Sequence, residues 1–139
     1  MNSAALHQAA FTRLAGFTAL TSQLGTTGVK SKVPQPSKAE AVAAFPYVTF
    51  EFPSIVPFDT DDNDGGNAVL RVHVWARSPS DLVWRGVLDS VYDALHKYQI
   101  PIGGANTVDC LFQVSNVMDD PDGITTHAWS DFRITYDSI

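Results

Sequence analysis

Cysteine is almost absent from this chain, and no catalytic motif can be read in it. Cys110 is the single cysteine among 139 residues, which excludes an internal disulfide framework and a cysteine metal cage. Its neighbours in "VDCLF" predict a packed, inert thiol. The sequence also contains no G-x-S-x-G, no H-E-x-x-H, no C-x-x-C and no phosphate-binding glycine loop. We therefore predict no catalytic residues and no cofactor.

Positive charge is scarce as well. Nine Lys and Arg stand against fifteen Asp and Glu, and the net charge is -6. A general nucleic-acid binder is basic, so we expect no specific binding of DNA; an acidic surface would let DNA slide past. No signal peptide and no long apolar run is present, so we expect a soluble protein that is used without export or membrane contact.

Hydrophobic residues make up 45% of the chain, which is enough for one globular domain over residues 1–139. Acidic residues are concentrated in two predicted turns. These turns hold seven of the fifteen acids, namely Asp59, Asp61, Asp62, Asp64, Asp119, Asp120 and Asp122.

The first acidic turn lies in "FDTDDNDGGN", near residues 59–67, and invites comparison with a calcium loop. An EF-hand loop needs oxygen ligands at positions 1, 3 and 5, Gly at 6 and Glu at 12. With Gly65 at position 6, position 12 is Arg71; with Gly66, position 12 is Val72. Both registers fail, so a solvated turn is favoured over a metal site or an acidic active site.

Residues 2–24 are predicted to form a helix, because apolar residues recur at every third or fourth position, with Gly16 expected to kink or divide it. The next segment, 26–44, is rich in Thr, Ser, Lys and Pro, and its prolines exclude a helix. We predict a flexible segment with a short extended piece at 29–33. It is either a solvated linker or an arm that becomes ordered on a partner.

Alternating apolar and polar residues predict four strands in two hairpins. The first hairpin pairs residues 45–52 with 68–77, and the acidic turn is its tip. The second pairs 108–118, with Cys110, Phe112 and Val114 on one face, with 124–136 across an Asp-Gly turn.

Between the hairpins, "SPSD" predicts a helix that runs to about Tyr98, with Ser78 as its cap and Pro79 at its first position. The order of elements is then α-β-β-α-β-β. We predict an α+β fold in which two helices pack on an antiparallel sheet of about four strands.

The sheet face turned away from the apolar side is the main candidate for function. Its aromatic and basic side chains are Arg71, His73, Trp75, Arg77, Trp129 and Arg133. Trp and Arg are enriched at protein interfaces. This face is either an interface or is covered by the N-terminal helix. His73 and His127 lie on strands that could be neighbours, and ordinary residues are favoured over a metal pair.

Four stretches, taken in order, resemble a known family. They are "VPQPSKAEAVAAFPYVTFE", "AVLRVHVWARS", "VWRGVLDSVYDALH" and "DGITTHAWSDFRITY". They are similar to an extended segment leading to a Pro-Tyr strand, a second strand, a helix and the closing strand of the tail-completion proteins of long-tailed bacteriophages. These are also called tail terminators or tail-to-head joining proteins. The resemblance runs from about Phe17 to Tyr136.

The resemblance implies structural work in the virion and no catalysis. Such proteins form a ring, usually of six copies, that stops growth of the tail tube and meets the head connector. The genome passes through the lumen. The implied partners are therefore further copies of this chain, the tail tube protein and the connector. The implied location is the tail or neck of the virion, and the host cytoplasm during assembly.

Two hypotheses about residues follow. The aspartates of the first acidic turn line the lumen or dock on a neighbouring ring, and Trp75, Arg77 and Trp129 lie at subunit contacts. Two alternatives stay open: another head-tail connector or minor tail protein, and a small enzyme or metal-binding protein that uses the aspartate turns.

Overall fold

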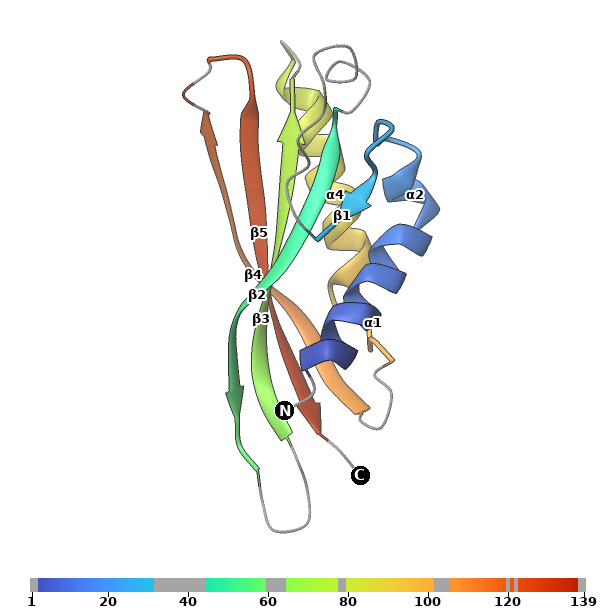
Figure 1. The fold of residues 1–139 in the computed structure, drawn as a ribbon, viewed down its shortest axis with the longest axis vertical. Helices are drawn as coiled ribbons and strands as arrows, with labels where there is room; N and C mark the ends of the chain where they lie inside the picture. The colour runs from blue at the N-terminus through green and yellow to red at the C-terminus, as the bar shows by residue number, and fades with distance from the viewer. Residues whose placement is uncertain are drawn as a thin grey trace.

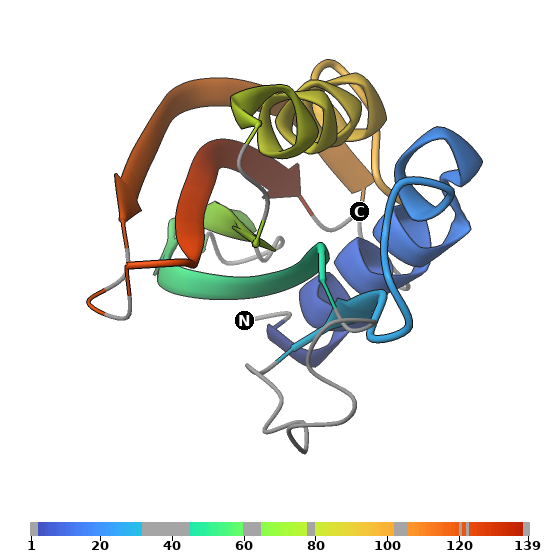
Figure 2. The ribbon, with the colours of Figure 1, turned by 90° about the horizontal axis from the view of Figure 1, so that it is seen from above.

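The computed structural model describes residues 3–31, 45–59, 65–77, 80–101, 106–119, 121 and 123–137. Three described helices lie on one side of a twisted five-stranded sheet (Figures 1 and 2). In chain order the elements are α1 (Ser3–Gly16), α2 (Thr18–Thr21), β1 (Val29–Lys30), β2 (Tyr47–Pro57), β3 (Gly65–Ala76), α4 (Asp81–Leu95), β4 (Asn106–Asp119) and β5 (Thr126–Asp137).

The expected α+β class is confirmed, but the sheet is mixed and has five strands in the order β1-β2-β3-β5-β4. The additional strand, β1, runs parallel to β2 and pairs Val29 with Val48. It is held there because Gly28 adopts a left-handed turn with a φ of 66° and accepts a hydrogen bond from the Val48 N–H at 3.0 Å. The predicted extended piece is thus shorter than expected, and residues 32–44 lie outside the described part of the chain.

The two predicted hairpins are present and are joined side by side. β2 pairs with β3, β4 pairs with β5, and β3 pairs with β5, all antiparallel. The two hairpins point in opposite directions: β2 ends and β3 begins at the bottom of Figure 1, whereas β4 ends and β5 begins at the top. The first hairpin is longer than predicted, because β2 continues to Pro57 and β3 begins at Gly65.

The hydrophobic core lies between the helices and one face of the sheet. On the sheet side it contains Leu70, Val72 and Val74 of β3, all fully buried. On the helix side, α1 contributes the predicted stripe, and α4 contributes a second one. These helix residues are Leu6, Ala10, Leu14, Trp84, Val87, Val91 and Leu95. None of the described helices is long and apolar enough to span a membrane.

The helix boundaries differ from the prediction at three places. The N-terminal helix is divided after Gly16, so two helices replace one. The cap of α4 is Ser80, whose Oγ accepts the N–H of Leu82 at 3.3 Å. The expected cap Ser78 was wrong, because "SPSD" offers two serines and the second one has the extended backbone of a cap. α4 also ends at Leu95, before the expected Tyr98.

A bulge in β4 overturns the predicted faces of that strand. Phe112 pairs with Phe132, but Val114 pairs with Asp131, so Gln113 is an extra residue. An extra residue reverses the alternation of side chains beyond it. Cys110 is therefore buried as predicted, whereas Val114 points to the other face and is 44% exposed.

We expect Gly66→Ala to destabilise the fold, because a Cβ at Gly66 would lie 2.5 Å from Oη of the buried Tyr136. Such overpacking lowers the free energy of unfolding by about 1–3 kcal/mol. The matched control is Gly16→Ala, where a Cβ meets nothing within 4 Å. Urea unfolding of both variants provides the measurement. Equal free energies of unfolding for the two would contradict the packing described at Gly66.

Candidate protein interface on the open sheet face

The face of the sheet opposite the helices carries alternate side chains of β2, β3 and β5. We call it the open face and define it by Thr49, Glu51, Arg71, His73, Trp75, His127, Trp129, Asp131 and Arg133. The alternative that the N-terminal helix covers this face is wrong. α1 packs on the opposite face, where its His7 ring lies 4.9 Å from Phe50.

An aromatic stack crosses the open face between β3 and β5. Trp75 lies directly opposite His127, and the two rings are nearly parallel, with centroids 3.8 Å apart at an angle of 5°. Trp129 flanks His127 at 5.1 Å. The indole N–H of Trp75 donates to Oγ1 of Thr49 at 3.1 Å, so this ring is held by His127 on β5 and by Thr49 on β2. Both tryptophans are half-buried, so part of each ring is exposed on the open face.

The two strand histidines are neighbours, as the sequence allowed. Nδ1 of His73 lies 2.6 Å from Nε2 of His127, and Nε2 of His73 lies 3.0 Å from Oε1 of Glu51. One imidazole must donate and the other accept, so the pair is a hydrogen-bonded unit. Among the described residues, no group of three or more His, Cys, Asp or Glu side chains is placed to hold a metal ion.

Arg71 and Asp131 form a paired charge next to this stack. The guanidinium donates twice, from Nε to Oδ1 at 2.8 Å and from Nη2 to Oδ2 at 3.1 Å. These hydrogen bonds raise the pKa of Arg71. The side chain of Asp131 is only 14% exposed, so its hydrogen bonds to Arg71 offset the cost of removing this carboxylate from water.

The remaining predicted residues lie at the borders of the open face or away from it. Arg77 follows the end of β3, donates from Nε to Oγ1 of Thr125 at 2.9 Å and lies over the ring of Phe45. Arg133 is exposed on β5. Asp59 is exposed just beyond β2, and the aspartates at 61, 62 and 64 lie outside the described residues. The structure therefore brings Arg71, His73, Trp75 and Trp129 together and places Asp59 apart from them.

Sequence reasoning missed the acidic partners on the open face, Glu51 and Asp131. Glu51 lies opposite Arg71 in the β2–β3 register, and Asp131 lies opposite it in the β3–β5 register. Glu51 and Arg71 belong to one predicted hairpin, so their opposite charges on adjacent strands were a signal available in the sequence.

Cys110 is buried and chemically quiet. Burial, with a smaller effect of Asp109, raises the pKa of its thiol to about 12. A thiol that stays protonated at neutral pH is a poor nucleophile, which agrees with the inert thiol predicted from its neighbours.

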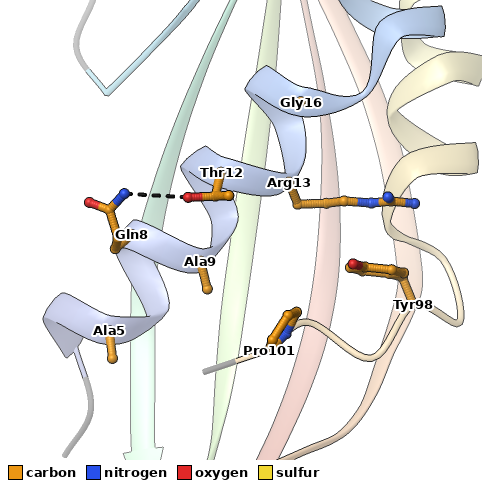
Figure 3. Close-up of a pocket in the computed structure, with 8 residues that line it drawn as sticks. All are labelled: Ala5, Gln8, Ala9, Thr12, Arg13, Gly16, Tyr98 and Pro101. Atoms are coloured by element: carbon orange, nitrogen blue, oxygen red, sulfur yellow. Dashed lines mark hydrogen bonds between the residues drawn. The ribbon is translucent and has the colours of Figure 1, made fainter. Parts of the chain in front are cut away.

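A shallow groove of about 450 Å³ lies on the helix side, between α1 and the chain after α4 (Figure 3). Arg13 spans it, donating from Nε to the Ala94 carbonyl at 2.7 Å and lying 3.7 Å from the centroid of the Tyr98 ring. Gln8 and Thr12 form a hydrogen bond at its rim (Figure 3). The Arg13 guanidinium therefore joins α1 to the end of α4 and to the residues that follow it.

Comparison with known proteins points to one family. The family model described as "Tail completion protein gp17" matches residues 8–137. A chain of the solved structure "Virion of native gene transfer agent (GTA) particle" has a TM-score of 0.84 at 16% identity, covering 99% of this chain and 98% of that one. The "Structure of bacteriophage SPP1 gp17 protein" has a TM-score of 0.59 at 24% identity, with coverage of 96% and 89%. No curated protein sequence matches. At these identities the structures show a shared fold.

We expect Arg71→Met to lower the free energy of unfolding by about 1–3 kcal/mol, because it leaves the poorly exposed Asp131 carboxylate without its donor. Adding Asp131→Asn should return part of this loss. Denaturant unfolding of the two single variants and the double variant measures the coupling. Arg133→Met, at an exposed arginine on the same face, is the control and should change stability by less than about 0.5 kcal/mol. Additive effects of the Arg71 and Asp131 changes would show that the pair is not coupled.

Proposed function

The chain belongs to the tail completion protein family, and from this premise we propose that its copies form a ring, of six subunits, that caps the tail tube and joins it to the head connector. DNA passes through the lumen of this ring. The observation that carries the proposal is the match of the family model over residues 8–137, nearly the whole chain. The fold shared with a chain of a gene transfer agent virion supports it.

The chemistry of the described residues suits assembly. The ionisable groups near the aromatic stack are engaged with one another, Arg71 with Asp131 and His73 with Glu51 and His127. Such paired groups hold side chains in place, and rigid aromatic groups lose little conformational entropy when a partner covers them. We therefore assign the open face a role in contact between proteins.

Within this proposal, Trp75, Arg77 and Trp129 contact the neighbouring subunit, with Arg71, His73 and Arg133 around them. Trp and Arg are the residues that most often dominate interface energies, particularly when they are held in one conformation. Trp75 meets this condition because it is stacked on His127 and hydrogen-bonded to Thr49.

We assign the acidic turn to the lumen, with docking on a neighbouring ring as the alternative position. Asp59 follows the far end of β2, where the first hairpin extends beyond the helices (Figure 1). Asp61, Asp62 and Asp64 continue the chain from there. Carboxylates facing DNA repel its phosphates, so the genome is not held by the ring as it passes.

Trp75→Ala should abolish or weaken ring formation while the fold survives, because it removes the centre of the aromatic stack. The measurement is light scattering with negative-stain imaging, in the presence and absence of purified tail tubes. A six-subunit ring of the 15.1 kDa chain has a mass of 6 × 15.1 = 90.6 kDa. Leu82→Ala is the control, since Leu82 is 78% exposed on the helix side. Rings formed normally by a folded Trp75→Ala protein would refute the assigned contact.

Changing Asp59, Asp61, Asp62 and Asp64 together to Asn should impair tail joining or genome passage. The expected result is a fall in infectious titre with normal levels of folded protein. The control variant carries Asp89→Asn and Asp93→Asn, which neutralise two exposed acids on α4. An unchanged titre for the four-residue variant would remove the acidic turn from the proposed mechanism.

A further inference from the structure

The two edges of the sheet are protected very differently. The strand order places β1 and β2 at one edge and β4 at the other. An edge strand presents unpaired N–H and C=O groups, and soluble proteins usually block them with proline, charge, a bulge or a covering segment. Such devices are present at both ends of one edge, but only along the first half of the other.

The β2 edge is blocked at both of its ends. β1 pairs with Val48 and Thr49. Further along, the N–H of Phe58 donates to the Gly65 carbonyl at 2.9 Å, toward β3. By alternation, the nitrogen of Pro57 faces the edge. A second proline, Pro53, lies at the irregularity of β2 between Glu51 and Ser54. Proline has no N–H, so β2 cannot donate to another strand at Pro57.

The first half of the β4 edge is covered by the turn that follows α4. The N–H of Lys97 donates to the Cys110 carbonyl at 2.7 Å. The N–H of Phe112 donates to Nδ1 of His96 at 3.1 Å. These two bonds occupy one carbonyl and one N–H on the outward side of β4, just before the bulge at Gln113.

Beyond the bulge, residues 114–119 form what we call the exposed edge. Among the described residues, only β5 pairs with this part of β4. From Val114 to Met118 this edge contains no charged residue and no proline, and its one charged residue is Asp119 at the end of the strand. Its apolar side chains are exposed, Val114 at 44%, Val117 at 48% and Met118 at 49%. This edge therefore lacks the protection that the rest of the sheet has.

The register with β5 shows which backbone groups face outward. Phe132, Ser130 and Ala128 alternate along β5 and share one orientation. Their partners on β4 share one orientation too, and these partners are Phe112, Ser115 and Val117. The N–H of Phe112 faces outward, to His96, so the backbone groups of Ser115 and Val117 also face outward.

We propose that the free protein forms a two-fold dimer by antiparallel pairing of the exposed edge with the same edge of a second copy. A two-fold axis at Asn116 sets the outward-facing Ser115 of each copy against Val117 of the other, so four backbone hydrogen bonds form. The same register sets Val114 opposite Met118 of the second copy, on the open-face side. The exposed edge is thus complementary to itself in both hydrogen bonding and apolar contact.

The dimer does not depend on the proposed ring. An isologous contact relates two copies by a two-fold axis, whereas a ring that meets a tube on one side and a connector on the other has two different faces. The dimer is therefore a state of the free protein that shields its exposed edge, and it dissociates when the subunit enters an assembly.

Sedimentation equilibrium of the full chain over a range of concentrations tests the dimer. The expected masses are 15.1 kDa and 2 × 15.1 = 30.2 kDa. Val117→Lys should raise the Kd for dimerisation by about tenfold or more, because it places a charge between the paired edges. The matched control is Val56→Lys, at a 60% exposed valine on the blocked β2 edge, and it should leave the Kd unchanged.

A second variant tests the register. Asn116→Cys places one thiol opposite its own copy across the axis, and mild oxidation should link the dimer covalently, since opposed residues of this kind have Cα atoms about 4.5–5.5 Å apart. Asn67→Cys, exposed on β3, should not link it. A monomer at every concentration, or a dimer that Val117→Lys leaves intact, would overturn the proposal. A dimer sensitive to Val117→Lys that Asn116→Cys fails to link would overturn its register.

Discussion

The antiparallel pairing of β3 with β5 is the contact on which the rest of the structure depends. It continues without a shift along all twelve residues of β3, whereas the β2–β3 and β4–β5 pairings each contain an irregularity. Because side chains alternate along a strand, this register assigns every central residue to one of two faces. A slip by one residue would move Val72 and Val74 out of the core and bring Arg71 and His73 into it.

The same pairing builds the candidate interface. The stack of Trp75 on His127 and the ion pair of Arg71 with Asp131 both join β3 to β5, directly opposite the buried side of the sheet. The core and the open face are thus two sides of one set of backbone hydrogen bonds. A substitution on one face can therefore change the stability of the other. The free energy of unfolding of each interface variant has to be measured beside its assembly.

Membership of the tail completion family is consistent with a small acidic domain that carries two of its three tryptophans, Trp75 and Trp129, and several charged side chains on the open face. An assembly protein must keep faces available for partners and still avoid open-ended association before it is used. The blocked ends of the β2 edge and the covered half of the β4 edge limit pairing with other strands. The exposed edge has no such cover among the described residues.

Local patterns in the sequence determined the α+β class, the buried stripe of α1, the two hairpins, most of the aromatic and basic residues of the open face and the quiet thiol of Cys110, because each depends on the pattern of residues within short segments. The ordered stretches also identified the family. Tertiary structure alone decided the parallel strand β1, the choice of Ser80 over Ser78, and the bulge that turns Val114 outward. It also decided that His73 meets His127 and that Arg71 meets Asp131, across 54 and 60 residues of chain. The reason is that register between distant segments is set by how the whole core packs, and no single segment contains that information.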